Sequence, residues 1–416
     1  MLLYEIIIHL FSQTIRFAAF FDPKARKWVE GRRNWRARLA SSLPTDSEKP
    51  KRTLWLHAAS LGEFEQGRPI IEAFREQYPD WRIVLTFFSP SGYEVRKHYP
   101  QADLVCYLPA DTHRNTRDFL DLVKPDAAVF VKYEFWANYL FELKKRGTPA
   151  LLVSALFREK QPFFKWYGGF WRKMLGCFAH VFVQNEGSAR LLQRLGLQNF
   201  TIAGDNRVDR VLSIAASVRE NPNVAAFAAR RKRVLIAGST WAADEAILLP
   251  VLRQPAFLHT QLIIAPHEPS ETNVRQLCDE AEAAIRYSQM GHSPPPDSRV
   301  LVIDNVGMLN SLYRYGTVAY IGGGFGKGIH NTLEPAAFGL PIIFGPRYQK
   351  FEEARQFVAR GGAFPVSDAE ALAAVLSKLE DPIFYEKASR AVRGYLEESK
   401  GATEKVLRFL ERVQDS

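Results

Sequence analysis

The chain has few cysteines and lacks a recognisable set of metal ligands. Its three cysteines, Cys106, Cys177 and Cys278, lie far apart, without paired or metal-ligand spacing. This spacing excludes a disulfide framework and indicates a reducing compartment such as the cytosol. The histidines share no metal-ligand spacing either, so we expect no metal site and interpret five of them as ordinary core or surface residues: His57, His98, His113, His180 and His292.

A long uncharged apolar segment is also missing. Residues 2–21 are long enough to cross a bilayer, but they include Glu5, His9 and Arg16. No small-residue cleavage site follows them, and the basic residues come after the apolar stretch, which is the reverse of the order in a signal peptide. We therefore predict a retained helix that contacts a membrane. Whether this helix spans the bilayer or lies on it is left open by the sequence.

Positive charge is concentrated directly after this segment. The net charge of the chain is +10, and residues 22–38 hold seven basic side chains against Asp22 and Glu30. Anionic lipid headgroups are the expected partner, and Trp28 and Trp35 suit a membrane interface. A nucleic acid is the rival partner for such a run, and a helix packed on its own domain is the alternative without a membrane. The basic residues are Lys24, Arg26, Lys27, Arg32, Arg33, Arg36 and Arg38.

The length and the apolar pattern predict an α/β protein with two domains. A chain of 416 residues, of which 47% are hydrophobic, exceeds what one core usually serves. Short apolar runs alternate with longer helical patterns, as in parallel sheets covered by helices. We expect two Rossmann-like, doubly wound domains that face a cleft, with ligand loops at the carboxyl ends of the strands. The runs lie at 53–57, 82–87, 127–131, 150–153, 180–183, 234–237, 262–265, 300–303, 318–321 and 341–344.

A polar and charged interval at 205–233 interrupts this alternation and separates the two domains. We place the membrane-associated helix and basic segment at 1–40, the N-terminal domain at 41–215 and the C-terminal domain at 216–383. The last helical stretch, 384–416, is expected to return to the N-terminal domain. No internal repeat is present in the sequence.

Residues 320–346 have the pattern of a strand, a glycine-rich loop, a helix and a second strand. Glycines let backbone N–H groups approach a ligand closely, and the N-terminus of a helix favours an anion. Glu334, in the first turn of the predicted helix, can accept two hydrogen bonds from a vicinal diol such as a ribose. The segment therefore predicts a nucleotide site. In the alternative interpretation, the glycines only form a tight turn and Glu334 only complements the helix dipole.

Two carboxylates occupy equivalent places in the N-terminal half. Glu63 follows the first apolar run and opens a helical pattern, and Glu134 follows the run at 127–131. A carboxylate at the carboxyl end of a strand is well placed to act as a general base, although a glutamate at a helix start also complements the helix dipole. The recurrence of the arrangement favours a catalytic pair.

The motifs around these carboxylates resemble those of the 3-deoxy-D-manno-octulosonic acid (Kdo) transferases of lipopolysaccharide biosynthesis, which are inverting glycosyltransferases of the GT-B architecture. Residues 60–63 match the family motif Ser-Val-Gly-Glu, and 132–138 match Glu-Thr-Glu-Leu-Trp-Pro-Asn, with Lys132 in place of the first acid. The resemblance implies that Glu63 is the catalytic base and that Glu134 stabilises the transition state. It also implies a basic transition-state residue at Arg207, where residues 204–209 align with Gly-Ser-Leu-Lys-Phe-Asp.

The same resemblance places the donor, CMP-Kdo, mainly on the C-terminal domain. His267 matches a nucleotide-contacting histidine, but Pro266 replaces the preceding arginine of the family and Trp241 replaces a histidine of a Ser-Thr-His segment. The resemblance assigns further nucleotide-sugar contacts to Val306, Gly307, Met308, Gly328, Asn331, Thr332, Leu333 and Glu334. The glycine-rich loop adds Gly324 and Gly326 as predicted phosphate contacts.

The implied reaction is transfer of Kdo from CMP-Kdo to a lipid A precursor (lipid IVA), at the cytoplasmic face of the bacterial inner membrane. It needs no metal and no cofactor, and we expect no nucleic-acid partner. The aromatic and basic run at 163–173 faces either the acceptor or the protein core. Two alternatives are a GT-B transferase or epimerase that uses a UDP-sugar, and a catalytically inactive, membrane-attached nucleotide-binding module.

Overall fold

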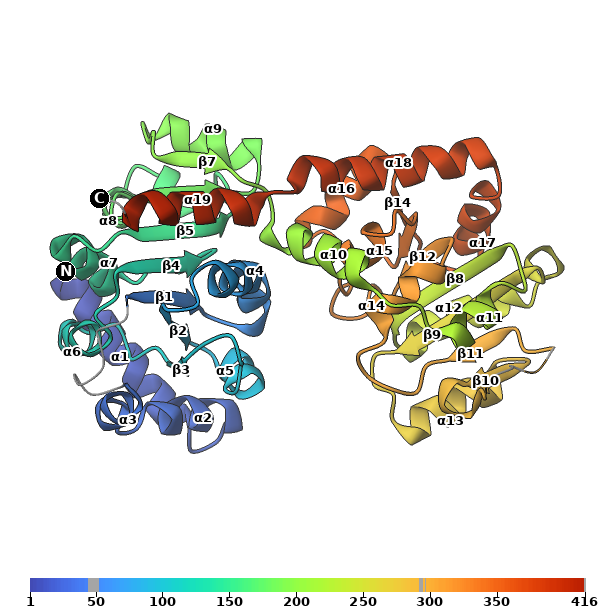
Figure 1. Ribbon diagram of the computed structural model, residues 1–416, viewed down its shortest axis with the longest axis horizontal. Coiled ribbons are helices and arrows are strands. Elements are labelled where there is room, and N and C mark those ends of the chain that lie inside the picture. Colours follow the sequence, from blue (N-terminus) through green and yellow to red (C-terminus); the bar gives the residue numbers. More distant parts are fainter. Residues whose placement is uncertain (44–51, 292–294, 296, 415–416) are drawn as a thin grey trace. The chain divides into compact units, whose positions relative to one another are not determined.

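The computed structural model describes residues 1–43, 52–291, 295 and 297–414; His292 lies outside them. The chain forms two compact units (Figure 1). The N-terminal unit comprises Met1–Asp209 and Ser399–Ser416, and the C-terminal unit comprises Arg210–Glu398. The corresponding boundaries expected from the sequence were 215/216 and 383/384.

The N-terminal unit is built on a seven-stranded parallel sheet with the order β3-β2-β1-β4-β5-β6-β7. Its strands are β1 (Thr53–Ala58), β2 (Arg82–Phe87), β3 (Leu104–Tyr107), β4 (Ala127–Val131), β5 (Ala150–Ala155), β6 (His180–Val183) and β7 (Phe200–Ile202). Its helices are α1 (Leu2–Ala18), α2 (Pro23–Arg32), α3 (Trp35–Ser42), α4 (Leu61–Gln77), α5 (Pro90–Arg96), α6 (His113–Val123), α7 (Ala137–Arg146), α8 (Gly169–Leu175), α9 (Glu186–Arg194) and α19 (Ala402–Gln414).

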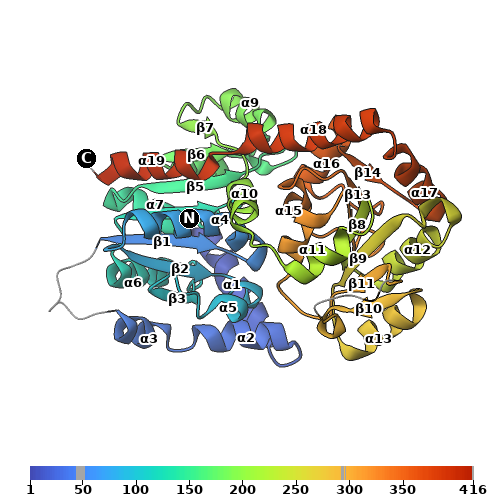
Figure 2. The same cartoon turned by 45° about the vertical axis from the view of Figure 1, so that its right-hand side comes forward.

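Both faces of this sheet are buried, which explains why its strands have nearly continuous apolar sequences. In β1, Trp55 packs with Tyr139 of α7 on one face, whereas Leu56 packs with Phe64 of α4 and Val406 of α19 on the other. Successive side chains of a strand point to opposite faces, so one apolar run serves two cores. Figure 1 and Figure 2 both show α19 alongside this sheet.

The N-terminal helices are attached to the sheet by polar contacts. Tyr4 of α1 donates a hydrogen bond to Asp111 at 2.6 Å, and Glu5 accepts one from the side chain of Asn138 at 2.8 Å. Glu5, which counts against a membrane span in the sequence, therefore serves to dock α1 on its own unit. The described residues include no helix that combines the length and hydropathy needed to cross a bilayer.

Two residues of the basic segment do not lie where the sequence analysis placed them. Trp28 is buried, and so is Arg32, whose guanidinium donates to the carbonyl oxygens of Leu108 at 2.8 Å and Phe88 at 2.9 Å. The expectation that Arg32 binds lipid headgroups and that Trp28 lies at a membrane interface is therefore wrong. Arg32 stacks on the Trp28 ring, which shows that both side chains anchor α2 to the domain.

The C-terminal unit repeats the design with the order β10-β11-β9-β8-β12-β13-β14, again all parallel. Its strands are β8 (Arg233–Thr240), β9 (Thr260–Pro266), β10 (Ala284–Arg286), β11 (Val300–Val302), β12 (Val318–Ile321), β13 (Ile342–Phe344) and β14 (Ala363–Pro365). Its helices are α11 (Pro222–Ala228), α12 (Ala242–Leu252), α13 (Glu271–Glu280), α14 (Leu309–Leu312), α15 (Leu333–Ala336), α16 (Glu352–Arg360), α17 (Ala369–Lys378) and most of α18 (Pro382–Ser399). The helix α10 (Asn206–Ser217) begins in the N-terminal unit and continues into this one.

Four strands were missed by the sequence analysis, and all four are edge strands. They are β3 and β7 in the first sheet and β10 and β14 in the second, each three or four residues long. Edge strands have only one neighbouring strand and are less buried, so their apolar pattern is short and weak. The ten predicted apolar runs coincide with the ten inner strands.

Candidate functional site

The two carboxylates lie at the topological switch point of the N-terminal sheet. Strand β1 pairs with β2 on one side and with β4 on the other, and helices α4 and α7, which follow β1 and β4, pack on opposite faces. Open α/β sheets bind ligands at the carboxyl ends of the strands where the connections diverge in this way. Glu63 in the first turn of α4 and Glu134 before α7 flank that position.

The Glu63 carboxylate is held by its own helix and has a shifted pKa. One oxygen accepts a hydrogen bond from the backbone N–H of Ser60 at 3.1 Å, so the capping interpretation is correct as far as it goes. Burial and, to a smaller extent, the charge of Glu134 together raise the pKa of Glu63 from 4.5 to about 7, although Lys132 and nearby backbone hydrogen bonds oppose the rise. A carboxylate that titrates near neutral pH is suited to accept a proton during catalysis.

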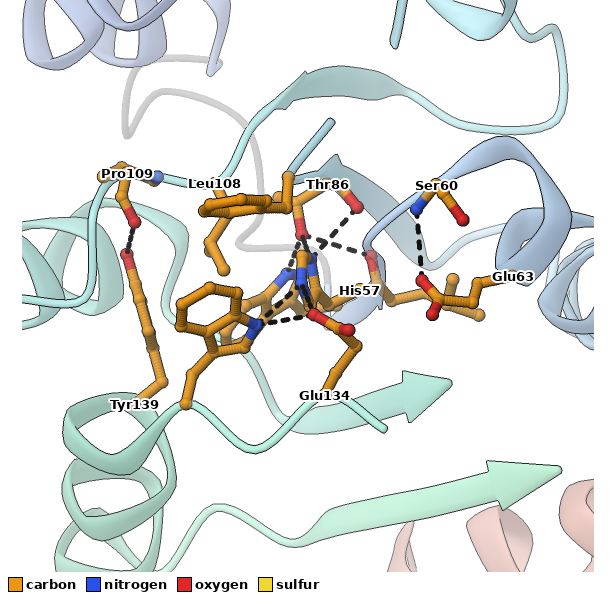
Figure 3. Close-up of polar contacts among 12 residues, drawn as sticks. His57, Ser60, Glu63, Thr86, Leu108, Pro109, Glu134 and Tyr139 are labelled. Atoms are coloured by element: carbon orange, nitrogen blue, oxygen red, sulfur yellow. Dashed lines mark hydrogen bonds and ion pairs between the residues drawn. The ribbon is translucent and has the colours of Figure 1, made fainter. Parts of the chain in front are cut away.

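Glu134 is almost completely buried, with 8% of its surface exposed. Its Oε2 accepts a hydrogen bond from the indole N–H of Trp136 at 2.7 Å and lies 3.0 Å from His57 Nε2. Figure 3 shows the Glu134 carboxylate directed toward His57, with Glu63 beside Ser60 on the adjoining element. Two neighbouring ring nitrogens thus fix the direction of a carboxylate that has little access to water.

His57 is a part of this site that the sequence analysis missed, because it classed His57 with the ordinary histidines. The side chain is fully buried in β1, and its Nδ1 lies 2.9 Å from Thr86 Oγ1. The signal available in the sequence was a histidine inside an otherwise apolar strand, six residues before Glu63. A buried polar side chain requires hydrogen-bonding partners, but only the structure identifies them.

Arg207, the expected transition-state cation, is paired with a second missed residue. Its guanidinium donates to both carboxylate oxygens of Asp205, with the shortest contact at 2.6 Å. Burial alone would raise the pKa of Asp205, but Arg207 and, to a smaller extent, Lys132 lower it. Asp205 is therefore a buried anion that fixes Arg207 and offsets part of its charge. The catalytic role of Arg207 remains a prediction.

In the C-terminal unit, close packing accounts for most of the glycines in the predicted phosphate loop. A Cβ on Gly324 would lie 2.6 Å from the backbone of Gly345, and Gly328 has a φ of +132°, which other residues rarely adopt. Nothing comparable restricts Gly326, which is exposed. The tight-turn interpretation therefore explains the glycines at positions 324 and 328. Packing and backbone conformation do not explain the glycine at position 326.

A buried aspartate, Asp244, holds this loop in place. It lies in the first turn of α12 and accepts hydrogen bonds from the Gly323 N–H at 2.9 Å, the Tyr320 hydroxyl at 2.8 Å and the Trp241 N–H at 3.0 Å. These contacts connect the ends of β8 and β12, the two strands at the switch point of the second sheet.

Three rings form a stack at the same edge of the second sheet. The ring of His267 lies between those of Trp241, at 4.6 Å, and His330, at 4.4 Å. Burial lowers the pKa of His330, and the adjacent His267 adds to this effect. Trp241, which departs from the family motif, thus contacts the histidine that the resemblance assigns to the nucleotide. It remains partly exposed, at 42%.

The other predicted nucleotide contacts differ in exposure. Val306 is 86% exposed, and Gly307 has a φ of +100° in the turn before Met308 and α14. Pro266 ends β9. Thr332 and Leu333 have fully buried side chains, so their side chains face the core of the unit. Glu334 lies in the single turn α15 and accepts a hydrogen bond from Asn331 at 2.9 Å.

No group of three or more potential ligands suited to a metal ion occurs in the described part of the chain. The candidate site of the N-terminal unit consists of two carboxylates, a buried histidine and an arginine. The C-terminal unit has a candidate site of its own, a glycine loop with stacked rings.

Comparisons with solved structures identify the fold. The structure of UDP-GlcNAc 2-epimerase from Neisseria meningitidis bound to UDP-GlcNAc matches with a TM-score of 0.60 and 14% identity, covering 87% of this chain and 100% of that one. MurG from Acinetobacter baumannii matches with a TM-score of 0.56 and 14% identity, covering 87% of this chain and 100% of the MurG chain. These likenesses confirm the predicted GT-B architecture of two Rossmann-like domains.

Comparisons of sequence identify the relatives. Residues 33–210 match the family model described as 3-deoxy-D-manno-octulosonic-acid transferase (kdotransferase). Among curated proteins, the 3-deoxy-D-manno-octulosonic acid transferase of Aquifex aeolicus is 27% identical over 86% of this chain and 96% of its own. That of Bordetella pertussis is 28% identical over 86% of both chains. The N-terminal unit therefore carries the domain of the Kdo transferase family, and the chain is a homologue of Kdo transferases over most of its length.

Proposed function

We propose that this protein transfers Kdo from CMP-Kdo to the sugar of a lipid A precursor. The observation that carries the proposal is the pair Glu63 and Glu134 at the switch point of the N-terminal sheet, in a chain homologous to Kdo transferases. Glu63 is the group whose pKa, about 7, matches a general base at neutral pH.

In the proposed reaction, a hydroxyl oxygen of the acceptor forms a bond to the anomeric carbon of Kdo while the bond from that carbon to the CMP phosphate oxygen breaks. Glu63 accepts the hydroxyl proton, and CMP leaves with the bonding electron pair. Glu134 supplies negative charge in two places: next to Glu63, and next to the positive charge that develops on the sugar. Arg207, held by Asp205, offers positive charge to the departing phosphate.

The donor is assigned to the C-terminal unit. Gly326 is exposed in the glycine loop, Glu334 offers a carboxylate oxygen to a ribose diol, and His267 presents a ring supported on both faces. The proposed mechanism uses no metal ion, since charge on the leaving group is offset by arginine and by backbone donors.

The assay uses purified protein with labelled CMP-Kdo and lipid IVA, and measures the labelled glycolipid formed. UDP-GlcNAc is tested in parallel, because epimerases share the fold. Glu76→Gln, an exposed glutamate on the same helix as Glu63, is the matched control for Glu63→Gln. Turnover of UDP-GlcNAc without transfer of Kdo would reject the proposal.

The acceptor lies in a membrane, and the surface that we assign to the membrane is the outer face of α1. This helix and the turn that follows it expose large apolar side chains, and α2, the next turn and α3 expose basic side chains. We propose that α1 lies in the interface of the inner membrane on its cytoplasmic side. The exposed apolar residues are Leu2, Leu3, Ile6, Ile7, Leu10, Phe11, Phe17, Phe20 and Phe21, and the exposed basic ones are Lys24, Arg26, Lys27, Arg33 and Arg38.

A further inference from the structure

We propose that His57 is a positioning residue that holds the Glu134 carboxylate by donating a hydrogen bond from its Nε2–H, in a proton arrangement set by Thr86. The proposal rests on the proposed function in one respect, namely that Glu134 acts next to Glu63 during transfer. It assigns to a buried histidine of β1 a role that neither the sequence motifs nor the comparisons indicate.

The first step is the direction of the hydrogen bonds on the Thr86 side. The indole N–H of Trp55 donates to Thr86 Oγ1 at 2.8 Å, and indole nitrogen is a donor only. The Thr86 hydroxyl must then donate its own proton elsewhere. His57 Nδ1 lies at 2.9 Å, whereas the alternative acceptor, the Leu56 carbonyl oxygen, lies at 3.5 Å. Nδ1 also lies 3.2 Å from the Thr86 carbonyl oxygen, which can only accept a hydrogen bond, but this contact is longer than the one to the hydroxyl. The shorter contact makes Nδ1 the acceptor and leaves the ring proton of a neutral His57 on Nε2.

The second step is the contact on the other side of the ring. His57 Nε2 lies 3.0 Å from Glu134 Oε2, in a place where both side chains are buried. A lone pair on Nε2 would face an anionic oxygen there, which is unfavourable at low dielectric. An Nε2–H instead donates to it. The indole N–H of Trp136 lies closer to Glu134 Oε2, at 2.7 Å, than to Nε2, at 3.1 Å, so it also serves the carboxylate.

The resulting chain leaves every polar group satisfied. It runs from Trp55 to Thr86 and His57 and ends at Glu134, which receives a second bond from Trp136 (Figure 3). The two donors fix the position of the Glu134 carboxylate next to Glu63. A buried network of this kind is rigid only when all of its members are paired. Loss of one donor should therefore change the electrostatic environment of Glu63.

The charges around Glu63 determine what a pH profile would report. The ionised Glu134 raises the pKa of Glu63 in addition to burial, and Lys132 and two backbone N–H groups, those of Ala59 and Ser60, lower it. When Glu134 loses the His57 donor, its carboxylate is no longer held beside Glu63, and its repulsion of Glu63 weakens. The acid limb of the rate profile, where Glu63 must be ionised, should then move to lower pH. A purely structural role for His57 would lower the amount of folded enzyme without moving this limb.

The first experiment measures the tautomer and needs no substrate. The full-length protein is labelled with ¹⁵N-histidine, and the His57 signals are those among the nine histidines that disappear in His57→Gln. The proposal expects a proton on Nε2 and an unprotonated Nδ1 at pH 8. In Thr86→Val, which removes the hydroxyl but keeps the shape, the Nε2-protonated fraction should fall. A proton on Nδ1 with bare Nε2 in the wild type would overturn the proposal.

The second experiment compares His57→Gln with His57→Asn in the Kdo transfer assay. The glutamine amide reaches the position of Nε2 and should keep the acid limb of the wild type. The asparagine amide reaches only the position of Nδ1, so kcat should fall roughly 10- to 100-fold, as for loss of a hydrogen bond to a charged group, with the limb at lower pH. Circular dichroism and CMP binding verify folding of both variants.

The two proposals fail in different ways. A wild type that shows the Nε2 tautomer but transfers no Kdo would reject the proposed function and keep the positioning of Glu134 by His57. Conversely, normal transfer by the wild type with an unchanged acid limb in His57→Asn would retain the function and overturn the positioning role.

Discussion

Replacing Glu63 with glutamine should remove catalysis and, at alkaline pH, make the N-terminal unit more stable. The folded state raises the pKa of this carboxyl from 4.5 to about 7, so the folded protein binds the proton more tightly than the unfolded chain does. Stability is therefore lost as the pH rises from about 4.5 through about 7. A rise of this size corresponds to a cost of about 3 kcal/mol above pH 7, and partial exposure of the side chain reduces it to about 1–3 kcal/mol.

Glutamine avoids this cost but keeps the local structure. Its side-chain oxygen can still accept the hydrogen bond from the Ser60 N–H, because glutamine serves as well as glutamate at this position of a capping box. At pH 8, Glu63→Gln should therefore exceed the wild type in unfolding free energy by about 1–3 kcal/mol, and near pH 4.5 the two should agree. The rate of Kdo transfer should fall by about 100- to 10,000-fold, as expected for loss of a general base.

The stability assay is urea unfolding followed by tryptophan fluorescence at pH 4.5 and pH 8. Of the eight tryptophans, all but Trp241 lie in the N-terminal unit, so the fluorescence signal reports mainly on that unit. Glu76→Gln, with an exposed carboxylate on the same helix, should show no pH-dependent difference. A Glu63→Gln protein that is less stable than the wild type at pH 8, or that keeps most of its activity, would refute the reasoning.

Four further changes have expected outcomes. Glu334→Ala should weaken CMP binding by roughly 1–3 kcal/mol in calorimetry through loss of charged hydrogen bonds, and unchanged affinity in both Glu334→Ala and His267→Ala would place the donor elsewhere. Asp244→Asn should destabilise the C-terminal unit by about 1–3 kcal/mol, because a buried N–H loses its carboxylate partner; an unaltered thermal transition would contradict this. Lys132→Met should move the acid limb of the rate profile to higher pH, because Lys132 lowers the pKa of Glu63; a limb at the same or lower pH would reject that coupling. Lys24→Gln with Lys27→Gln should reduce flotation with anionic vesicles roughly 20- to 30-fold at low salt, at about 1 kcal/mol per charge, whereas the control pair Lys378→Gln with Lys387→Gln should not; equal effects of the two pairs would argue against membrane contact through α2.

The inner strands of both sheets were predictable, and the reason is physical. A strand buried on both faces must be apolar throughout, and ten such runs are visible in the sequence. The edge strands β3, β7, β10 and β14 need no such run and were missed. The alternation of strands and helices predicted parallel sheets, but the order of the strands within each sheet came only from the structure.

The site was only partly predictable, because the partners of its charged residues come from distant segments. The positions of Glu63 and Glu134 after strands follow from local sequence. In contrast, the pairing of Glu134 with His57 joins residues 77 positions apart, and nothing in the spacing indicates it. The glycines show that one residue type can have two explanations, since Gly324 is required by its contact with Gly345 whether or not the loop binds a phosphate. The phosphate loop stays a prediction.

Lys132 is the departure from the family motif whose effect on the site can be followed most directly. It has a φ of +63°, in the left-handed region that disfavours side chains, directly after β4. Its ammonium lowers the pKa of both Glu63 and Asp205. With an acid at this position, a further negative charge would add to those of Glu63 and Glu134 in a partly buried crevice, and the pKa of Glu63 would rise above about 7. A lysine instead keeps a useful fraction of Glu63 ionised at neutral pH. The exchange is therefore compatible with a general base at Glu63, and it argues against the interpretation of this chain as an inactive relative.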